Sequence, residues 1–474
     1  MHYQAATERA GMRDARADFL DRRRSVAGPG FNRWLVPPAA LCIHLAIGQV
    51  YAFSVFNKPM TQLLGIAAPA PGDWTIPQLG WIFSIAIVFL GLSAALGGKW
   101  VESAGPRKAM FAAALCFCGG LFIAGGGVAL HLLWLVYLGY GIVGGAGLGL
   151  GYISPVSTLI KWFPDRPGLA TGTAIMGFGG GALIGAPLAV GLMKHFATAT
   201  NEGVAATLLA MGAIDLCFML AGSALVSVPP DGWQPAGFVA TAAPHTLVAT
   251  GDVLVGQAVK TPQFYLLWGV LFLNVTAGIG VLGQASLMIQ EMFPLRFPHE
   301  TPAAIAASTA AAAGFVGLLS IFNMAGRIGW ASASDALGRK PTYAIFFALG
   351  TLLYALVPTI GKLGNLPLFA LCYGVILSMY GGGFATIPAY LRDLFGTRNV
   401  GAIHGRLLTA WSAAGVAGPV LVNYIRQYEL DRGVPKADAY STTMYVMALL
   451  LVGGFVCNAL VRPLAARHFV EAAA

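Results

Sequence analysis

The chain has 474 residues, of which 57% are hydrophobic and only 10% are charged, and its mean hydropathy is +0.72. A soluble domain carries roughly 25% charged residues, so this composition excludes a soluble protein and predicts a membrane protein. The net charge of +9 does not indicate nucleic-acid binding, because the Lys and Arg residues gather in the N-terminal region and in alternate short loops. Apolar runs of about twenty residues are long enough to cross the hydrocarbon core as helices, and barrel strands would be half that length.

Twelve apolar segments follow one another along the chain, and the two ends differ from them in composition. The predicted spans are residues 34–57, 78–100, 108–129, 132–157, 168–193, 205–228, 263–290, 304–331, 341–360, 366–390, 401–424 and 441–463. Residues 1–33 mix Arg and Asp without an apolar core or a cleavage site, so they are not a signal peptide. We expect them to form a mobile cytoplasmic tail, and we expect residues 464–474 to form a second tail.

The weakest segment between spans is residues 229–262, which begins with Pro229 and Pro230 and continues with small residues and few charges. Such a composition is typical of a linker. We therefore predict two six-helix bundles, residues 34–228 and 263–463, that are joined by this segment on the cytoplasmic side.

The distribution of basic residues predicts the orientation of the chain. If the N-terminus is cytoplasmic, about 20 of the 28 Lys and Arg residues lie in cytoplasmic segments, which is the bias that orients membrane proteins. We therefore expect both termini to be cytoplasmic, in a multi-pass protein of the plasma membrane, which in a bacterium is the inner membrane. Arg327 is left over inside a predicted span. A guanidinium at that depth costs several kcal/mol unless it faces water, a partner or an anion.

A polar loop motif occurs twice, after the second and after the eighth predicted span, at an offset of 233 residues. Its acidic, glycine and basic positions are Glu102, Gly105 and Arg107 in the first copy and Asp335, Gly338 and Arg339 in the second. The loops at residues 163–166 and 395–398 repeat at an offset of 232 residues, so the pattern predicts a duplicated six-helix unit. We expect each acid to face the N-terminus of a neighbouring helix and the basic residues to face lipid phosphates.

These loops resemble the hallmark loops of the major facilitator superfamily. Within it, residues 48–56, 155–166 and 323–327 are similar to the oxalate/formate antiporter family and, more distantly, to the monocarboxylate transporters. The resemblance implies an all-α integral membrane fold of twelve transmembrane helices in two pseudo-symmetric six-helix bundles. It also implies that Arg327, which matches the helix-8 arginine of those families, pairs with a substrate carboxylate. The oxalate-exchanging member has a lysine in helix 11 where this chain has Trp411, so the resemblance favours a site for one carboxylate.

The residues around Arg327 supply further candidates for substrate binding. Asn323 lies one helical turn before Arg327, where it could contact the substrate, orient the guanidinium or bond a neighbouring helix. Trp411 could line a cavity or pack against other helices. The remaining candidates are mid-span aromatic residues that line a cavity or pack: Tyr51, Tyr152, Tyr380 and Phe384.

Four other polar residues have a functional and a structural interpretation. Asp215, His44 and His404 could relay protons or could be polar groups with ordinary hydrogen-bond partners. Lys58 could attract anions or simply extend its amine towards the membrane surface. The glycine-rich runs in the fourth, fifth and tenth spans are expected to let helix backbones approach closely rather than to bind a nucleotide.

The chain contains no catalytic motif, nucleotide-binding loop or metal-spaced cluster, so it is predicted not to be an enzyme and to need no cofactor. A sensor related to transporters usually carries an appended soluble domain, and a 33-residue tail is too short for one. We predict a monomeric secondary transporter of a small organic anion, a monocarboxylate, that works by alternating access within membrane lipid. The alternative is an oxalate:formate antiporter. Exchange and co-transport with protons both remain open.

Overall fold

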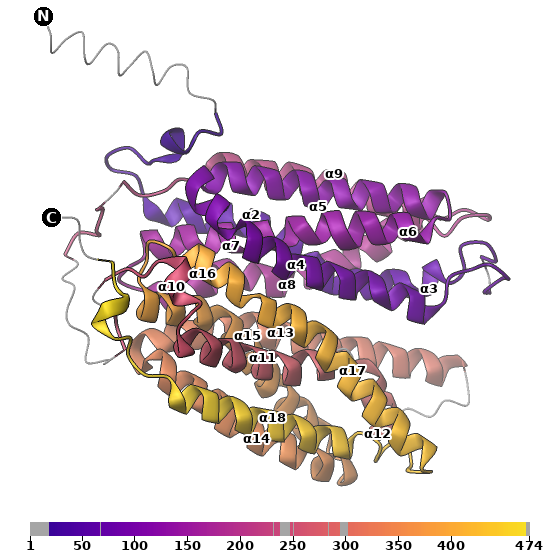
Figure 1. The fold of residues 1–474 in the computed structure, drawn as a ribbon. Helices are drawn as coiled ribbons and strands as arrows, with labels where there is room; N and C mark the ends of the chain where they lie inside the picture. The colour runs from indigo at the N-terminus through magenta and orange to yellow at the C-terminus, as the bar shows by residue number, and fades with distance from the viewer. Residues whose placement is uncertain are drawn as a thin grey trace, which may run out of the picture.

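The computed structural model describes residues 19–66, 68–230, 232–237, 247–249, 251–282, 284–293 and 302–470. Within these ranges the regular structure is helical, and only isolated bridges join single residues. Eleven helices in the described ranges are long and apolar enough to cross a membrane. The helices form two bundles that lie side by side, with the chain termini at the same end of the molecule (Figure 1). The predicted all-α membrane fold is therefore confirmed.

The first bundle contains six spans, two of which are built from several helical segments. Its elements are α2 (Val36–Gly48), η3 (Gln49–Phe56), α3 (Asn57–Met60), α4 (Ile76–Ala104), α5 (Pro106–Ala129), α6 (Leu133–Val136), η4 (Tyr137–Gly144), α7 (Gly145–Trp162), α8 (Pro167–Phe196) and α9 (Val204–Leu225). Proline opens α5 and α8, where its missing N–H and fixed φ favour the first helical turn. Two short turns, η1 (Arg22–Ser25) and η2 (Arg33–Leu35), precede the bundle.

The second bundle repeats this arrangement with longer central helices. Its elements are α10 (Val255–Ala258), α11 (Pro262–Leu282), α12 (Ala285–Met292), α13 (Pro302–Leu337), α14 (Arg339–Lys362), α15 (Leu366–Phe395), α16 (Val400–Leu407), α17 (Thr409–Asp431) and α18 (Ser441–Leu460). A short turn, η6 (Ala466–His468), follows the last helix. Parts of the predicted tails and of the predicted linker lie outside the described residues.

Three spans differ from their predicted form in helix type or in length. The first span changes from α-helix to a 3₁₀ segment at Gln49, and the fourth passes through a π-helical stretch, Tyr137–Gly144. The eighth span was predicted to end at residue 331, but α13 continues to Leu337. The acidic residue of the second loop motif, Asp335, therefore lies on the last turn of a helix.

Glycines bring the two halves together, as expected for the glycine-rich runs. α8 lies along α13, and α4 lies along α16, so that these four helices form much of the contact between the bundles (Figure 1). A Cβ atom on Gly172 would stand 2.5 Å from the backbone oxygen of Arg327, and one on Gly98 would stand 2.8 Å from the Cα atom of Ala402. The backbones are in contact at these positions, and only glycine allows that approach.

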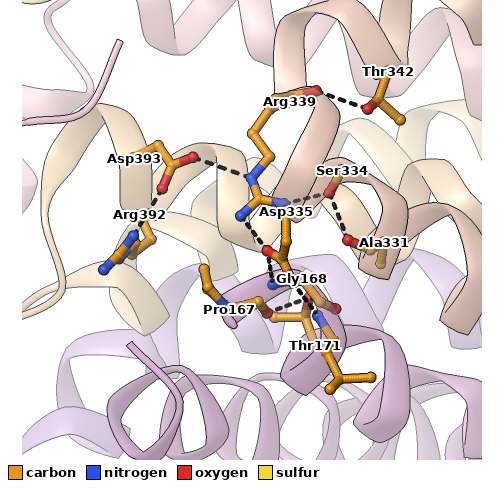
Figure 2. A network of polar contacts seen from close by, with 12 residues as sticks. Pro167, Gly168, Thr171, Ala331, Ser334, Asp335, Arg339, Thr342, Arg392 and Asp393 are labelled. Carbon is orange, nitrogen blue, oxygen red and sulfur yellow. Dashed lines mark hydrogen bonds and ion pairs between the residues drawn. The ribbon is translucent and has the colours of Figure 1, made fainter. Parts of the chain in front are cut away.

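The acidic residues of the two loop motifs join the halves at the end of the molecule that carries the termini. The two carboxylate oxygens of Asp335 accept hydrogen bonds of 2.8 and 2.9 Å from the backbone N–H groups of Gly168 and Leu169, at the start of α8 (Figure 2). The carboxylate of Glu102 accepts one of 3.1 Å from the N–H of Gly401, at the start of α16. The predicted contacts between the acids and neighbouring helix N-termini are thus confirmed.

The prediction that the basic loop residues face lipid phosphates was wrong for both arginines of the motif. Arg107 is 8% exposed, and it donates hydrogen bonds to the backbone oxygens of residues 19, 24 and 226. Arg339 is 7% exposed, and it pairs with Asp335 at 2.7 Å and with Asp393 at 3.1 Å (Figure 2). Gly105 and Gly338 have φ values of +86° and +90°, a conformation that glycine adopts without strain. The tight turns direct the arginines inwards to partners within the protein.

The described part of the N-terminal tail contacts the helix ends at residues 19 and 33, and its mobility stays a prediction. Arg33 makes two hydrogen bonds, of 2.6 and 2.9 Å, to the carboxylate of Asp165 in the loop between α7 and α8. Burial is the largest single influence and acts to raise the pKa of Asp165, but the hydrogen bonds from Arg33, a backbone hydrogen bond and the charges of Arg33 and Arg166 together leave the pKa below its usual value.

The contact of Gly168 with α13 gives a test of how closely the halves pack. A Cβ atom there would overlap the backbone oxygen of Ala331, so Gly168→Ala forces α8 away from α13. Overpacking of this kind costs about 1–3 kcal/mol. We expect a lower melting temperature for the purified variant. Gly191→Ala is the matched control, because it lies on the same helix with no atom within 4 Å of the added carbon. Equal melting temperatures for the two variants would contradict this packing.

Candidate functional site

Arg327 lies in the middle of the contact between the halves, on α13, and is 0% exposed. Its Nε donates a 3.1 Å hydrogen bond to Oδ1 of Asn323, and its Nη1 donates a 3.2 Å hydrogen bond to the backbone oxygen of Ile175 on α8. Its Nη2 has no hydrogen-bond partner. Among the described residues, none of the ion pairs includes Arg327. The guanidinium charge is therefore buried without a neutralising carboxylate.

Aromatic rings surround the guanidinium and come from both halves. The central carbon of the guanidinium lies 5.9 Å from the ring centre of Phe178 and 5.4 Å from that of Phe384. Trp411 packs against both of these rings, at 5.2 and 4.6 Å, and against Tyr152 at 5.3 Å. The ring faces give partial compensation for the buried charge through cation–π attraction. They also form an apolar wall for a bound molecule.

Several polar hydrogens in this cluster have no acceptor. Tyr152 is 0% exposed, and its hydroxyl lies close to the guanidinium but makes no hydrogen bond of normal geometry. The indole Nε1 of Trp411 also has none, although the side chain is 0% exposed. The hydroxyls of Tyr51 and Tyr380 lie 3.3 Å apart and join the halves on the other side of the cluster. Buried donors without acceptors are costly, so a molecule that accepts hydrogen bonds would be stabilised at this site.

Glycines leave the space in which Arg327 lies. A Cβ atom on Gly179 would stand 2.7 Å from Nε of Arg327, and one on Gly381 would stand 2.5 Å from Oδ1 of Asn323. The glycine runs in α8 and α15 thus serve the site as well as the helix packing. Together, the unpaired guanidinium, the free donors and the aromatic wall can bind an anion that has a small apolar part.

The structure brings together all seven residues that the sequence analysis proposed for substrate binding, from five spans. They are Arg327, Asn323, Trp411, Tyr51, Tyr152, Tyr380 and Phe384. Of the three roles considered for Asn323, the contact with Nε favours orientation of the guanidinium.

The loop-motif residues lie apart from this cluster, at the helix ends. Asp215 hydrogen-bonds to Gln49 at 2.8 Å, and Lys58 is exposed.

The sequence analysis missed Phe178, which contacts three rings of the cluster and the guanidinium. It lies in a glycine run, Gly177–Gly181, that was interpreted only as a packing surface. The internal repeat contained the signal, because Phe178 and Trp411 are 233 positions apart, the same offset as Glu102 and Asp335. Phe178, the repeat counterpart of the candidate Trp411, is therefore also part of the site.

Comparisons with known proteins show the family and the fold of the chain. The family model described as Major Facilitator Superfamily matches residues 39–419. The chain is 28% identical to an oxalate:formate antiporter of Oxalobacter formigenes over 82% of this chain and 83% of that protein. It is 26% identical to the human monocarboxylate transporter 11 over 92% of this chain and 85% of that protein. A crystal structure of the E. coli fucose:proton symporter superposes with a TM-score of 0.63 at 11% identity, covering 91% and 100% of the two chains.

The hydrogen bond between Asn323 and Arg327 gives a test of the site. Asn323→Asp replaces the side-chain amide by a carboxylate, which lies 3.1 Å from Nε of Arg327 and neutralises the guanidinium. We expect the variant to remain folded and to lose anion binding by more than about tenfold, since the built-in carboxylate competes with the ligand. The measurement is the rise in melting temperature on addition of carboxylates. Asn323→Ala serves as the control, because it removes the orienting bond without adding a charge. Undiminished anion binding by Asn323→Asp would show that the ligand does not use this guanidinium.

Proposed function

Because the chain belongs to the Major Facilitator Superfamily, we propose that this multi-pass membrane transporter carries a small monocarboxylate by alternating access. The observation that carries the proposal is the buried guanidinium of Arg327, which has a free Nη2 and no carboxylate partner among the described residues. A carboxylate is the ligand that this group binds best, through two parallel charge-assisted hydrogen bonds.

The charge and the aromatic lining of the site favour one carboxylate on an apolar or hydroxylated body. Arg327 supplies one positive charge, and the neighbouring groups Tyr152, Phe178, Phe384 and Trp411 are uncharged. The free hydroxyl and indole donors can bond a second oxygen of the substrate without adding charge. One relative, the human monocarboxylate transporter 11, is named for substrates of this class.

The proposed transport cycle uses the two halves as rigid bodies. An empty site leaves a bare charge between the halves, which disfavours movement through closed states, and a bound carboxylate neutralises that charge. The hydrogen bonds of Glu102 and Asp335 to helix N-termini hold the halves together at the end that carries the termini. Opening at that end requires these bonds to break. From the basic-residue bias, we propose that this end is cytoplasmic and that the protein works as a monomer in the plasma membrane, the inner membrane of a bacterium.

A second candidate is oxalate:formate exchange. It is favoured by the likeness to an oxalate:formate antiporter and by the free donors at Tyr152 and Trp411, which could receive a second carboxylate. The absence of a second cation near the site, among the described residues, counts against it, because two carboxylates bring two negative charges. An enzymatic activity is not proposed, since the relatives are transporters.

The proposal is tested by ligand-induced stabilisation of the purified protein with pyruvate, lactate, formate and oxalate. A ligand present at a hundredfold excess over its Kd adds about 2.7 kcal/mol to the stability, which is a measurable shift in melting temperature. We expect one or more monocarboxylates to stabilise the wild type. Arg327→Ala should abolish the shift, and Arg327→Lys should lose most of it, because an ammonium group cannot form the paired bonds of a guanidinium. Normal stabilisation and uptake by Arg327→Lys at matched expression would refute the role of this residue.

The identity of residue 411 gives a second test of substrate class. We expect Trp411→Lys, which adds a second cation beside Phe178 and Phe384, to gain stabilisation by oxalate and to lose affinity for monocarboxylates. Trp411→Phe keeps the apolar wall and serves as the control. A wild type that already responds to oxalate as strongly as to any monocarboxylate would favour the exchange alternative.

A further inference from the structure

A large cavity lies at the end of the molecule that carries the termini, away from the centre of the contact between the halves. Its volume is about 1080 Å³. One wall consists of η1, the ends of α4 and α7, and residues 228–230 and 232–234 of the linker. The opposite wall consists of Asp252 and the loop between α15 and α16. Among the described residues, the cavity shares none with the aromatic cluster around Arg327.

Hydrogen bonds fix the first of these walls. Arg107 is 8% exposed and donates hydrogen bonds of 3.3 Å to the backbone oxygens of Arg24 and Val226. Val228 forms backbone hydrogen bonds of 2.8 and 2.9 Å with residues 25–27. The described tail and the start of the linker are thus bonded to each other and to the first bundle where they line the cavity.

The second wall is fixed in a similar way. Oδ1 of Asp252 accepts hydrogen bonds of 2.8 and 2.9 Å from the backbone N–H groups of Thr397 and Arg398. The side-chain amide of Asn399 donates a 3.0 Å hydrogen bond to the backbone oxygen of Val253. The end of the linker is therefore bonded to the loop that leads into α16, which belongs to the second half.

The cavity carries an excess of positive charge. The described residues that line it include two carboxylates and five cations, which leaves an excess of three positive charges: Glu102 and Asp252 against Arg22, Arg23, Lys99, Lys161 and Arg398. A concave surface lined by one sign of charge concentrates the electric field and attracts ions of the opposite sign.

Both carboxylates already have partners within the protein. Glu102 pairs with Lys161 at 2.6 Å and accepts the N–H of Gly401, and Asp252 is bonded to the backbone as described above. Three cations of the cavity form no ion pair or side-chain hydrogen bond with any described residue: Arg23, Lys99 and Arg398. Their charges are therefore available to a bound anion.

The separation of these cations over three segments selects the class of ligand. A monocarboxylate has one charged group and can neutralise only one of them. Two or more linked phosphate groups offer several charged acceptor oxygens, which arginine and lysine both bind well. Cavities that hold small organic ligands measure roughly 300–1,000 Å³, so this cavity also has room for the organic part of a molecule of nucleotide size.

We propose that this cavity is a second anion site, which binds a multivalent phosphate-bearing molecule through Arg23, Lys99 and Arg398. Arg23 and Lys99 lie on the first wall and Arg398 on the second, so the bound molecule bridges the halves beside the bond between Glu102 and Gly401. This inference goes beyond the proposed function and holds whichever molecule Arg327 binds.

The bridging position gives the site a regulatory role. Opening of this end separates the two walls, so the phosphate-bearing molecule binds the closed form more tightly than the open form. A ligand that prefers one form shifts the population towards it. The molecule therefore holds this end closed and inhibits transport without occupying the central site.

The first test is the binding of pyrophosphate to the full-length protein in nanodiscs of neutral lipid. The ionic strength is kept constant, because salt screens exposed charges. We expect pyrophosphate to raise the melting temperature and sodium chloride of equal ionic strength to leave it unchanged. The double variant Arg23→Gln, Arg398→Gln removes one cation from each wall and should weaken pyrophosphate binding by more than about tenfold. Lys99→Gln alone should weaken it less.

A matched control removes two exposed cations from the other end of the molecule. Lys58 lies on α3 and Lys436 in the loop between α17 and α18, and neither side chain has an ion-pair partner among the described residues (Figure 1). The double variant Lys58→Gln, Lys436→Gln should bind pyrophosphate as the wild type does. Equal affinity of all these variants, or equal shifts with pyrophosphate and sodium chloride, would overturn the site.

The second test examines the bridge between the walls. We expect pyrophosphate to slow amide hydrogen exchange in residues 22–26 and in residues 397–401, because one ligand holds both walls. In proteoliposomes, pyrophosphate on the side of the termini should slow monocarboxylate counterflow even at saturating carboxylate, and the double variant Arg23→Gln, Arg398→Gln should resist this inhibition. Protection confined to one wall, or unchanged counterflow despite pyrophosphate binding, would overturn the closing role.

The source of the phosphate is decided by a second set of nanodiscs, which contain an anionic phospholipid. A lipid headgroup in the cavity would protect both walls without pyrophosphate and would block its binding, whereas a soluble ligand binds equally in both kinds of nanodisc. The binding and exchange measurements use no carboxylate, so their failure leaves the proposed function intact. Failure of carboxylates to stabilise the wild type would overturn the proposed function and leave this site standing.

Discussion

The buried charge of Arg327 is the constraint on which the centre of this molecule depends. A guanidinium removed from water is tolerated only where dipoles and ring faces replace its hydration. Here Asn323 and the carbonyl of Ile175 satisfy two of its nitrogens, and the rings of Phe178 and Phe384 face it. Glycine at position 179 leaves the required space. The third nitrogen, Nη2, makes no hydrogen bond of normal geometry, so it is available to donate to an anion.

The internal repeat explains how the halves are held around that charge. Glu102 and Asp335 are repeat counterparts, and the backbone N–H groups that they bind, at Gly401 and Gly168, are also 233 positions apart. Each half therefore uses its own acid to cap the first turn of a helix in the other half. The three bonds lie at the same end of the molecule and hold it closed. These bonds are partly buried, and a hydrogen bond to a charged group contributes only about 1.5–3 kcal/mol, which is small enough for the bonds to break during a transport cycle.

Sequence patterns predicted the charged residue, its helix neighbour Asn323 and the aromatic candidates, because each is unusual in a membrane span or one turn away from Arg327. They could not predict the direction in which Arg107 and Arg339 point, since a tight glycine turn can direct a basic residue to lipid or to the protein interior. They also left His404 ambiguous. Whether a buried imidazole has a partner depends on contacts between helices that are far apart in the sequence, and only the packed structure determines those contacts.

The aromatic wall is itself duplicated, whereas the charge is not. Phe178 and Trp411 are related by the 233-residue offset, and Tyr152 and Phe384 by the 232-residue offset of the loops that follow their helices. Their four rings pack around one another, with neighbouring centres 4.6–5.4 Å apart. The counterpart of Arg327 is Ala94, which packs against Gly405.

The duplicated unit thus supplies a nearly symmetric aromatic box at the contact between the halves, and one substitution in one copy supplies its charge. Under the proposed function, a symmetric box with an asymmetric charge would orient a bound carboxylate towards α13 and leave the first half to contact the rest of the substrate. The side chains that determine which carboxylate is carried should therefore lie mainly in the first bundle, and Tyr152 and Phe178 are the residues placed to do so.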